Sequence, residues 1–187
     1  LIHFLYVTIL CTRYLQRFQP LLCQVYKEIT GGTESTGLNY TVELNSLDKL
    51  KVQLAATFLR LASREKKLGL SLAGPHRDDL DFLVNGRSLR SFGSQGQQRS
   101  FLLAFKAAQV MDLEEEHQEP PVLLLDDLAS ELDSRRQEGF FNFLLNRSGQ
   151  VFLTSAQQPL LANQVQQTAS FFKVDHGLVS ATSPERG

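Results

Sequence analysis

A short apolar run that ends in two carboxylates, VLLLDD at residues 122–127, constrains the fold of this chain more than any other segment. Because its apolar residues follow the turn signal Pro120-Pro121, the pattern predicts a short, fully buried strand. Two acidic side chains at the tip of such a strand carry a desolvation cost unless a cation or hydrogen-bond donors meet them. A nucleotide-bound Mg2+ at the strand end of an open α/β sheet is the usual reason for that arrangement. A surface Asp-Asp pair that caps the next helix explains the same letters equally well.

A glycine-containing segment upstream, FGSQGQQR at residues 92–99, favours the nucleotide interpretation. Gly93 and Gly96 bracket Ser94, and a run of strong helix formers follows. A turn that enters a helix N-terminus presents free backbone N–H groups and the positive end of the helix dipole, which suits a phosphate. The Ser94 hydroxyl and the Gln97 amide can add side-chain donors. A flexible turn with an ordinary N-cap explains the segment about as well, and the G-x-x-x-x-G-K-[ST] pattern of a P-loop is missing from it.

Together, these two segments resemble the second half of an ATP-binding-cassette ATPase. Ser94-Gln95-Gly96-Gln97 stands where the signature motif would be, VLLLDD stands as the Walker B strand, and Ser130-Glu131-Leu132-Asp133 stands as the D-loop. The run GPHRDDL at residues 74–80 narrows the resemblance to the RecF family of bacterial recombination mediators. In that family GPHRDDL, GQ-R, LLLDD and SELD occur in this order, and the resemblance covers roughly residues 14–179.

The Walker B resemblance implies phosphoryl transfer from ATP to water, which is catalysed largely by positioning and charge neutralisation. Asp126 would hold Mg2+, directly or through a water, and Asp127 would orient or deprotonate the attacking water. Most transporter-type cassettes have Glu at the second place, and the shorter Asp127 fits a slow enzyme. The wider cassette family commonly has a γ-phosphate-sensing histidine near the end of the next strand, where this chain has Thr154 and Ser155.

The signature resemblance implies a site shared between two subunits. Ser94, Gly96 and Gln97 would not touch ATP held by their own chain but would close over the nucleotide of a second subunit. ATP would then drive formation of a two-fold homodimer. Ser130 and Asp133 of the D-loop would lie at the same dimer interface.

The family resemblance implies an ATP-dependent DNA-binding protein with weak, DNA-dependent ATP hydrolysis. ATP binding would form the dimer on single-stranded, gapped or duplex DNA, and hydrolysis would reopen it. The implied roles are recombinational repair, replication restart and the SOS response, with other recombination mediator proteins as partners. Phosphate contacts by basic side chains would make the DNA binding strongly salt-dependent.

The overall charge gives no hint of nucleic-acid binding, since the formal net charge is −1. Any DNA contact has to come from local basic patches. One such cluster lies on the far face of a helix expected over residues 47–68 and comprises Arg60, Arg64, Lys66 and Lys67. A solvated helix face is the more common explanation for such a cluster.

The expected fold class is α/β, the C-terminal part of an ABC-type ATPase head with a helical lobe. Residues 1–69 are expected to form the end of helical lobe II with one strand. Residues 70–187 are expected to carry the signature, Walker B and D-loop segments. The family pattern places a Walker A loop before residue 1, so these residues alone are expected to be inactive as an ATPase. The chain begins at Leu1 and its one methionine is Met111, which suggests a fragment.

Periodicity and turn signals predict the individual elements. Pro20 is expected to kink the first helix or to begin a second one. Helices are expected over 12–29, ended by Gly31-Gly32, and over 47–68, between a Ser46 cap and Gly69. Two more are expected from the signature turn through Val110 and from Ser130 to Gly149. An acidic surface linker is expected over 112–119. Strands are expected over 38–44, 70–72, 80–84, 122–125 and 151–153, the last of them buried as well. Asn85-Gly86 predicts a hairpin turn, and a closing hairpin is expected over 171–179.

The loop GPHRDDL contains several ionisable side chains, but the sequence assigns it no function. His76 and Asp78 can be drawn as an acid–base pair. A pairing of Arg77 with Asp78 or Asp79 in a tight Gly-Pro turn is the simpler interpretation.

The two cysteines and the first ten residues indicate where in the cell the protein is expected. Cys11 and Cys23 lie on apolar stretches without metal-ligand spacing, which predicts buried, reduced thiols in a cytoplasmic protein. The apolar stretch 1–10 is shorter than the ~20 residues that span a bilayer, so no membrane partner is expected.

Two other functions remain open from the sequence. An SMC-type ATPase fragment would carry a long heptad arm, which residues 1–30 do not show. A non-hydrolysing DNA-binding or docking fragment would keep the residues of the nucleotide site but would not hydrolyse ATP.

Overall fold

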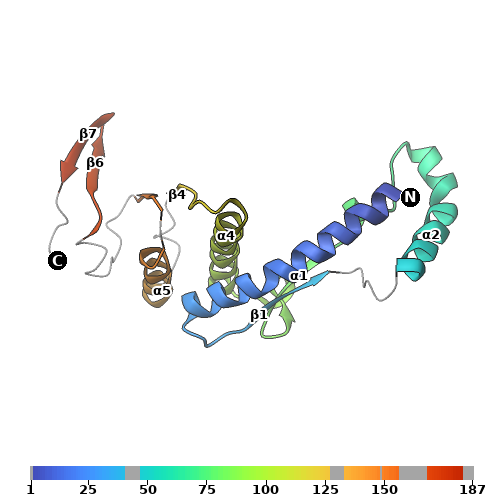
Figure 1. Cartoon of the computed structure of the whole chain (residues 1–187), viewed down its shortest axis with the longest axis horizontal. Helices are drawn as coiled ribbons and strands as arrows, with labels where there is room; N and C mark the ends of the chain where they lie inside the picture. The colour runs from blue at the N-terminus through green and yellow to red at the C-terminus, as the bar shows by residue number, and fades with distance from the viewer. Residues whose placement is uncertain (1, 41–46, 127–132, 148, 156–167, 183–187) are drawn as a thin grey trace.

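The computed structural model describes residues 2–40, 47–126, 133–147, 149–155 and 168–182. Figure 1 shows an elongated arrangement, in which α2 lies near the start of α1 and a C-terminal hairpin lies at the opposite end. The helices are α1 (Ile2–Thr30), α2 (Leu47–Leu68), the 3-10 turn η1 (Pro75–Arg77), α3 (Leu89–Phe92), α4 (Gln95–His117) and α5 (Ser134–Leu145). The strands are β1 (Thr36–Tyr40), β2 (Leu80–Val84), β3 (Arg87–Ser88), β4 (Leu123–Asp126), β5 (Val151–Thr154), β6 (Phe171–Asp175) and β7 (Leu178–Thr182).

The core forms where α1 packs against α4 and α5 (Figure 1). One face of α1 is fully buried at helical spacing, and each such aliphatic or aromatic side chain contributes about 1.5–3 kcal/mol by leaving water. Gly139 lets α5 approach the end of α1 closely, since a Cβ at this position would lie 2.7 Å from the Ile29 carbonyl oxygen. The buried residues of α1 are Phe18, Leu22, Val25, Tyr26 and Ile29, and those of α4 and α5 include Phe101, Ala104, Ala108, Phe140 and Phe143.

The first helix is longer than expected and continues through Pro20. Pro20 therefore does not begin a second helix, and residues 2–11 are helical as well. The expected end at the Gly31-Gly32 pair is confirmed, because both glycines have positive φ (63° and 74°). The Gly32 N–H donates to the Lys27 carbonyl at 2.8 Å, which satisfies an end carbonyl of the helix.

Strands β1, β2 and β3 form an antiparallel sheet in the order β1-β2-β3. The expected hairpin at Asn85-Gly86 is confirmed, and both residues have the positive φ that a two-residue turn of this kind requires (50° and 72°). Leu38 pairs with Phe82 in the register of β1 and β2. The expected strand over 38–44 corresponds to β1 as far as Tyr40, and residues 41–44 lie outside the described residues.

The segment Leu70–Leu72 is not a strand, contrary to the sequence expectation. Helix α2 ends at Leu68, and Gly69 has the expected positive φ of 66°. The Glu65 carboxylate then accepts hydrogen bonds from the Leu72 N–H at 2.6 Å and from the Ser71 hydroxyl at 3.3 Å. This local bonding gives the Leu72 N–H a partner on α2 in place of a strand neighbour. The expected cap residue Ser46 lies outside the described residues.

Helix α4 runs to His117, so most of the expected acidic linker is helical. Asp112 and Glu114 have basic partners from outside this helix. Arg17 of α1 lies 2.9 Å from Asp112, and Arg147 pairs with Glu114. These tertiary ion pairs stabilise a helical conformation that the local charge run does not reveal.

Strands β4 and β5 form a parallel two-stranded sheet, with Leu124 opposite Phe152. The expectation that both strands are fully buried is wrong. Leu125 faces the core and is 8% exposed, whereas Leu124 and Phe152 are 73% and 51% exposed on the opposite face. The sheet therefore has one packed face and one bare apolar face.

The closing hairpin is confirmed as β6 and β7, joined at His176 and Gly177 with φ of 47° and 81°. Nearly all its side chains are exposed. Within the described ranges, no helix has both the length and the apolar character needed to cross a membrane. Cys11 and Cys23 are free thiols of intermediate burial, and the Cys23 thiol donates to the Thr36 carbonyl.

Candidate functional site

The turn before α4 is built around a reciprocal capping box. Ser94 is the N-cap residue, and its Oγ accepts a hydrogen bond from the Gln97 N–H at 3.2 Å. In return, the Ser94 N–H donates to Oε1 of Gln97 at 3.0 Å. The box pre-orders the first turn of a 23-residue helix while Ser94 stays exposed. The N-terminal end of α4, with its positive dipole, is thus presented at the surface in a fixed shape.

Asp133 caps α5 in a similar way. Its Oδ1 accepts from the Arg136 N–H at 3.0 Å, and its Oδ2 lies 3.2 Å from Nη1 of the same arginine. The expected helix start at Ser130 is therefore displaced to Ser134, with Asp133 as the cap. Ser130 itself lies outside the described residues. The helix also ends at Leu145, before the expected Gly149.

Glu34 and Arg136 bring the Ser94 turn and the Asp133 cap together. The Gln97 Nε2 donates to Glu34 Oε1 at 3.2 Å, and Arg136 Nη2 lies 3.5 Å from the same oxygen. Tyr26 donates its hydroxyl to Glu34 Oε2 at 2.6 Å. Burial and then the hydrogen bond to Glu34 raise the pKa of Tyr26 well above its ordinary value of 10.0. Two motif segments that are far apart in the sequence therefore share one connected polar cluster.

Asp126 lies at the carboxyl end of β4, opposite Thr154 of β5. The Thr154 hydroxyl donates to Oδ1 of Asp126, and the Asp126 side chain is exposed. An exposed carboxylate beside a hydroxyl supplies the oxygen ligands that Mg2+ prefers, so these residues fit that ion. No group of three or more His, Cys, Asp or Glu side chains forms a metal site among the residues that the structure describes. Asp127 lies outside them.

The basic cluster on α2 is not part of this site. Its four residues are all exposed, and α2 packs near the start of α1, where the rings of Phe58 and Phe4 are 5.4 Å apart. In Figure 1 the helix lies well away from α4 and α5. The members of the cluster are Arg60, Arg64, Lys66 and Lys67.

The GPHRDDL loop begins with the η1 turn beside the end of α2. His76 and Arg77 both bond the Ser71 carbonyl, and the Asp78 carboxylate accepts from the Tyr40 hydroxyl at 2.6 Å. Burial and then the Asp78 hydrogen bond raise the pKa of Tyr40. The loop thus contacts both the segment that follows α2 and strand β1.

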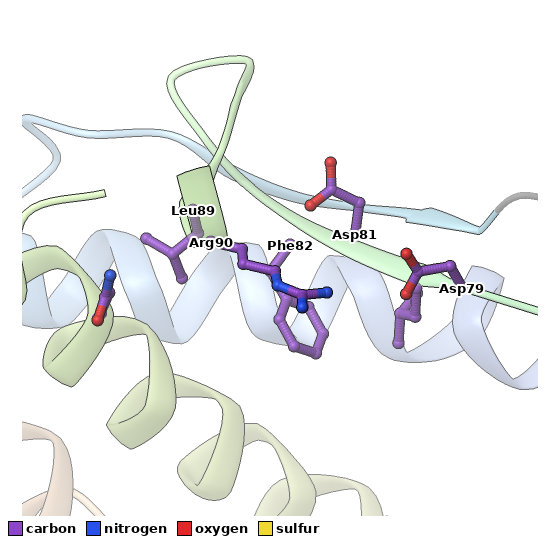
Figure 2. A pocket seen from close by; sticks show the side chains of 7 residues that line it. Asp79, Asp81, Phe82, Leu89 and Arg90 are labelled. Atoms are coloured by element: carbon purple, nitrogen blue, oxygen red, sulfur yellow. The ribbon is translucent and has the colours of Figure 1, made fainter. Parts of the chain in front are cut away.

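An open cavity of about 470 Å3 lies between β2, α3 and the start of α4. Figure 2 shows the Arg90 side chain extending along β2 in the direction of Asp79. The cavity is lined by Asp79, Leu80, Asp81, Phe82, Leu89, Arg90 and Gln98. None of its lining residues belongs to the Glu34–Arg136 cluster.

The sequence motifs mark Ser94, Gly96, Gln97, Asp126 and Asp133 as candidate site residues but do not mark Glu34 and Arg136. No local motif marks either residue. Glu34 follows the Gly31-Gly32 helix end, and Arg136 lies in the first turn of α5. The one available signal is that Arg136 follows the cap residue Asp133 by three positions.

Comparisons with known proteins place these features in context. No protein-family model matches the chain. The DNA replication and repair protein RecF of Syntrophotalea carbinolica is 50% identical over 165 residues, which cover 88% of this chain and 46% of that protein. RecF of Geobacter metallireducens is 42% identical over 171 residues, covering 89% of this chain and 47% of that protein. The chain thus spans about half the length of the curated relatives it matches.

Solved structures give the same result. The recombination mediator protein RecF-ATPrS matches 96% of this chain and 47% of its own with a TM-score of 0.70 and 26% identity. The structure of RecF-ATP has a TM-score of 0.68 and 27% identity. A structure from work on ATP-driven dimerization and DNA-stimulated activation of SMC ATPases has a TM-score of 0.57 at 12% identity, a likeness of fold alone. The expected ATPase-head fold is therefore confirmed.

Proposed function

The chain belongs to the RecF family, and from that premise we propose that it forms the C-terminal half of an ATP-dependent DNA-binding clamp used in DNA replication and repair. One observation carries this proposal. The Ser94 turn and the Asp133 cap, which come from different parts of the sequence, are joined by Arg136 and Glu34 next to an exposed helix N-terminus. A surface of this kind is suited to closing over a nucleotide held by another subunit.

In the proposed site, the Ser94 turn binds the terminal phosphates of ATP in trans. The capping box fixes the turn before the nucleotide arrives, so little ordering entropy is lost on binding. The dipole of α4 and its first N–H groups favour the phosphate charge. Gly96 makes room for the Arg136 guanidinium beside the first turn, Gln97 holds the shape of the turn, and Asp133 is proposed to lie at the same dimer interface. ATP then acts as the link between two subunits.

In the chain's own half-site, Asp126 is the residue that would hold Mg2+. The Thr154 hydroxyl fixes one oxygen of the Asp126 carboxylate and thereby orients it. When bound, Mg2+ neutralises phosphate charge as the terminal phosphate is transferred to water. Asp127 would position the attacking water, and its short side chain fits slow, DNA-dependent hydrolysis. Residues 1–187, which contain no G-x-x-x-x-G-K-[ST] pattern, are proposed not to hydrolyse ATP by themselves.

The proposed nucleic-acid ligands are single-stranded, gapped and duplex DNA, bound in recombinational repair, replication restart and the SOS response in the cytoplasm. Other recombination mediator proteins are the proposed partners. Arg60, Arg64, Lys66 and Lys67 supply an exposed basic face on α2 for phosphate contacts. The proposed division separates residues 1–69, the end of lobe II, from the head segment 70–187.

Association in the presence of ATP tests the nucleotide part of the proposal. The fluorescently labelled 187-residue chain is titrated with full-length RecF of Syntrophotalea carbinolica, in ATP or in ADP, and complex formation is followed by sedimentation velocity. We expect a complex in ATP that is weak or missing in ADP. Ser94→Arg should abolish it by filling the turn, whereas Ser63→Arg, on the exposed face of α2, should leave it intact. Equal association in ATP and ADP, or full association of Ser94→Arg, would overturn the proposal.

A further inference from the structure

We propose that Glu34 is a positioning residue that joins the Ser94 turn to the Asp133 cap, so that the two segments facing the second subunit's nucleotide move as one unit. This inference rests on the proposed function for its consequence. The coupling itself rests only on the geometry of the cluster. In this proposal Glu34 acts through its contacts with Gln97 and Arg136.

Both oxygens of the Glu34 carboxylate are occupied. Oε1 receives the Gln97 amide at 3.2 Å and lies 3.5 Å from Arg136 Nη2, and Oε2 receives the Tyr26 hydroxyl at 2.6 Å. The side chains of Glu34 and Arg136 are only 17% and 19% exposed. Hydrogen bonds to a charged group in such surroundings are stronger than neutral ones at the surface. Glu34 therefore ties the first turn of α4 to the first turn of α5 and to the core helix α1.

Arg136 is held between the two segments by more than one contact. Its Nη1 lies 3.2 Å from Asp133 Oδ2, and its Nη2 faces Glu34. The same guanidinium lies directly against Gly96, where an added Cβ would collide with Nη1. The absence of a side chain at Gly96 thus makes room for the arginine that connects the cap of α5 to the signature turn. A displacement of either turn must shift Arg136 and so reach the other turn.

Replacing the Glu34 carboxylate should separate the two turns while leaving each cap in place. Gln97 keeps its capping box with Ser94, and Arg136 keeps its bonds to Asp133. A role limited to general stability would instead loosen the whole chain. Two backbone hydrogen bonds report the difference, because each closes a first turn: Gln98 N–H to Ser94 O and Gln137 N–H to Asp133 O, both at 2.9 Å.

Amide hydrogen exchange on the 187-residue chain without nucleotide tests the coupling. In Glu34→Gln we expect the Gln98 and Gln137 amides to exchange about tenfold faster together, while the buried middle of α1 is unchanged. Glu65→Gln is the matched control, since Glu65 also accepts backbone and hydroxyl hydrogen bonds but lies at the end of α2. Arg136→Lys, which cannot reach Glu34 and Asp133 at once, should reproduce the paired effect. Faster exchange at one amide alone, at neither, or equally throughout the chain would overturn the proposal.

The association assay separates this inference from the function on which it rests. If the wild-type chain shows no ATP-dependent association, the proposed function fails, and the exchange result still decides whether the turns are coupled. If association occurs, Glu34→Gln should weaken it about tenfold. The double variant Glu34→Gln/Arg136→Gln should then lose little more than Arg136→Gln alone, because both changes break one connection. Strictly additive losses would show that Glu34 acts independently of Arg136 and would contradict the proposal.

Discussion

Arg17 of α1 and Asp112 of α4 form an ion pair across the main helix interface, with 2.9 Å between Nη2 and Oδ1. The Asp112 side chain is 6% exposed, whereas that of Arg17 is 54% exposed. Loss of the ion pair costs more free energy at the buried carboxylate than at the half-exposed arginine, because water can solvate the arginine but not the carboxylate.

Arg17→Met should therefore destabilise the chain by about 1–2 kcal/mol, because Asp112 stays buried without its cation. Urea unfolding followed by circular dichroism measures the loss. Arg13→Met, on an exposed position of the same helix, is the control. Equal effects of the two substitutions would mean that the Asp112 pairing adds nothing to stability.

The close approach of α5 to α1 at Gly139 predicts a second stability effect. Gly139→Ala should cost about 1–3 kcal/mol, since its Cβ would lie 2.7 Å from the Ile29 carbonyl oxygen and backbone must shift. Gly37→Ala meets no atom within 4 Å and should be neutral or slightly stabilising. Thermal unfolding of both variants distinguishes these cases. A neutral Gly139→Ala would show that the two helices are not in tight contact.

The two faces of the β4–β5 sheet should respond in opposite ways to the same substitution. Leu125→Thr should cost about 2–4 kcal/mol of stability, because this side chain is 8% exposed. Leu124→Thr should leave stability nearly unchanged and reduce self-association, because its side chain belongs to a bare apolar face. Urea unfolding and light scattering check the pair. The register is incorrect if Leu124→Thr proves the more destabilising of the two.

The buried Tyr26 hydroxyl predicts sensitivity to alkali. Because the folded state raises the pKa of Tyr26 above its ordinary value of 10.0, the protonated group stabilises the fold below pH 10. That contribution is lost as the pH rises above 10. The stability difference between pH 9 and pH 11 should be smaller in Tyr26→Phe than in the wild type, whereas the exposed control Tyr6→Phe should match the wild type. Urea midpoints at the two pH values provide the measurement, and an unchanged difference in Tyr26→Phe would contradict the assignment.

Local chemistry was sufficient to predict several elements from the sequence. The Asn85-Gly86 hairpin, the Gly31-Gly32 helix end and the Gly69 helix end all require positive φ, which few other residues adopt cheaply. An ordinary N-cap was one of the interpretations open at the turn before α4, and the structure identifies it as a capping box of Ser94 with Gln97 three residues later. In each case the residues that determine the structure are neighbours in the sequence.

The errors arose where distant partners decide the outcome. The acidic residues after Met111 are helical because Arg17 and Arg147 pair with them from other elements. The apolar residues of β4 and β5 do not show which face of the sheet packs against the helices and which face stays exposed. Asp133 replaces Ser130 as the cap of α5, and no periodic pattern distinguishes the two. The link from Glu34 to Arg136 joins positions 102 residues apart, so no local motif contains it.

The guanidinium of Arg136 that lies against Gly96 also limits how these positions can evolve. A side chain introduced at position 96 must push that guanidinium aside and so disturb its contacts with Asp133 and Glu34, and a shorter residue at position 136 would leave an empty space beside the turn. Drift at either place alone is therefore disfavoured, and the two should be inherited as a matched pair among close descendants of this sequence.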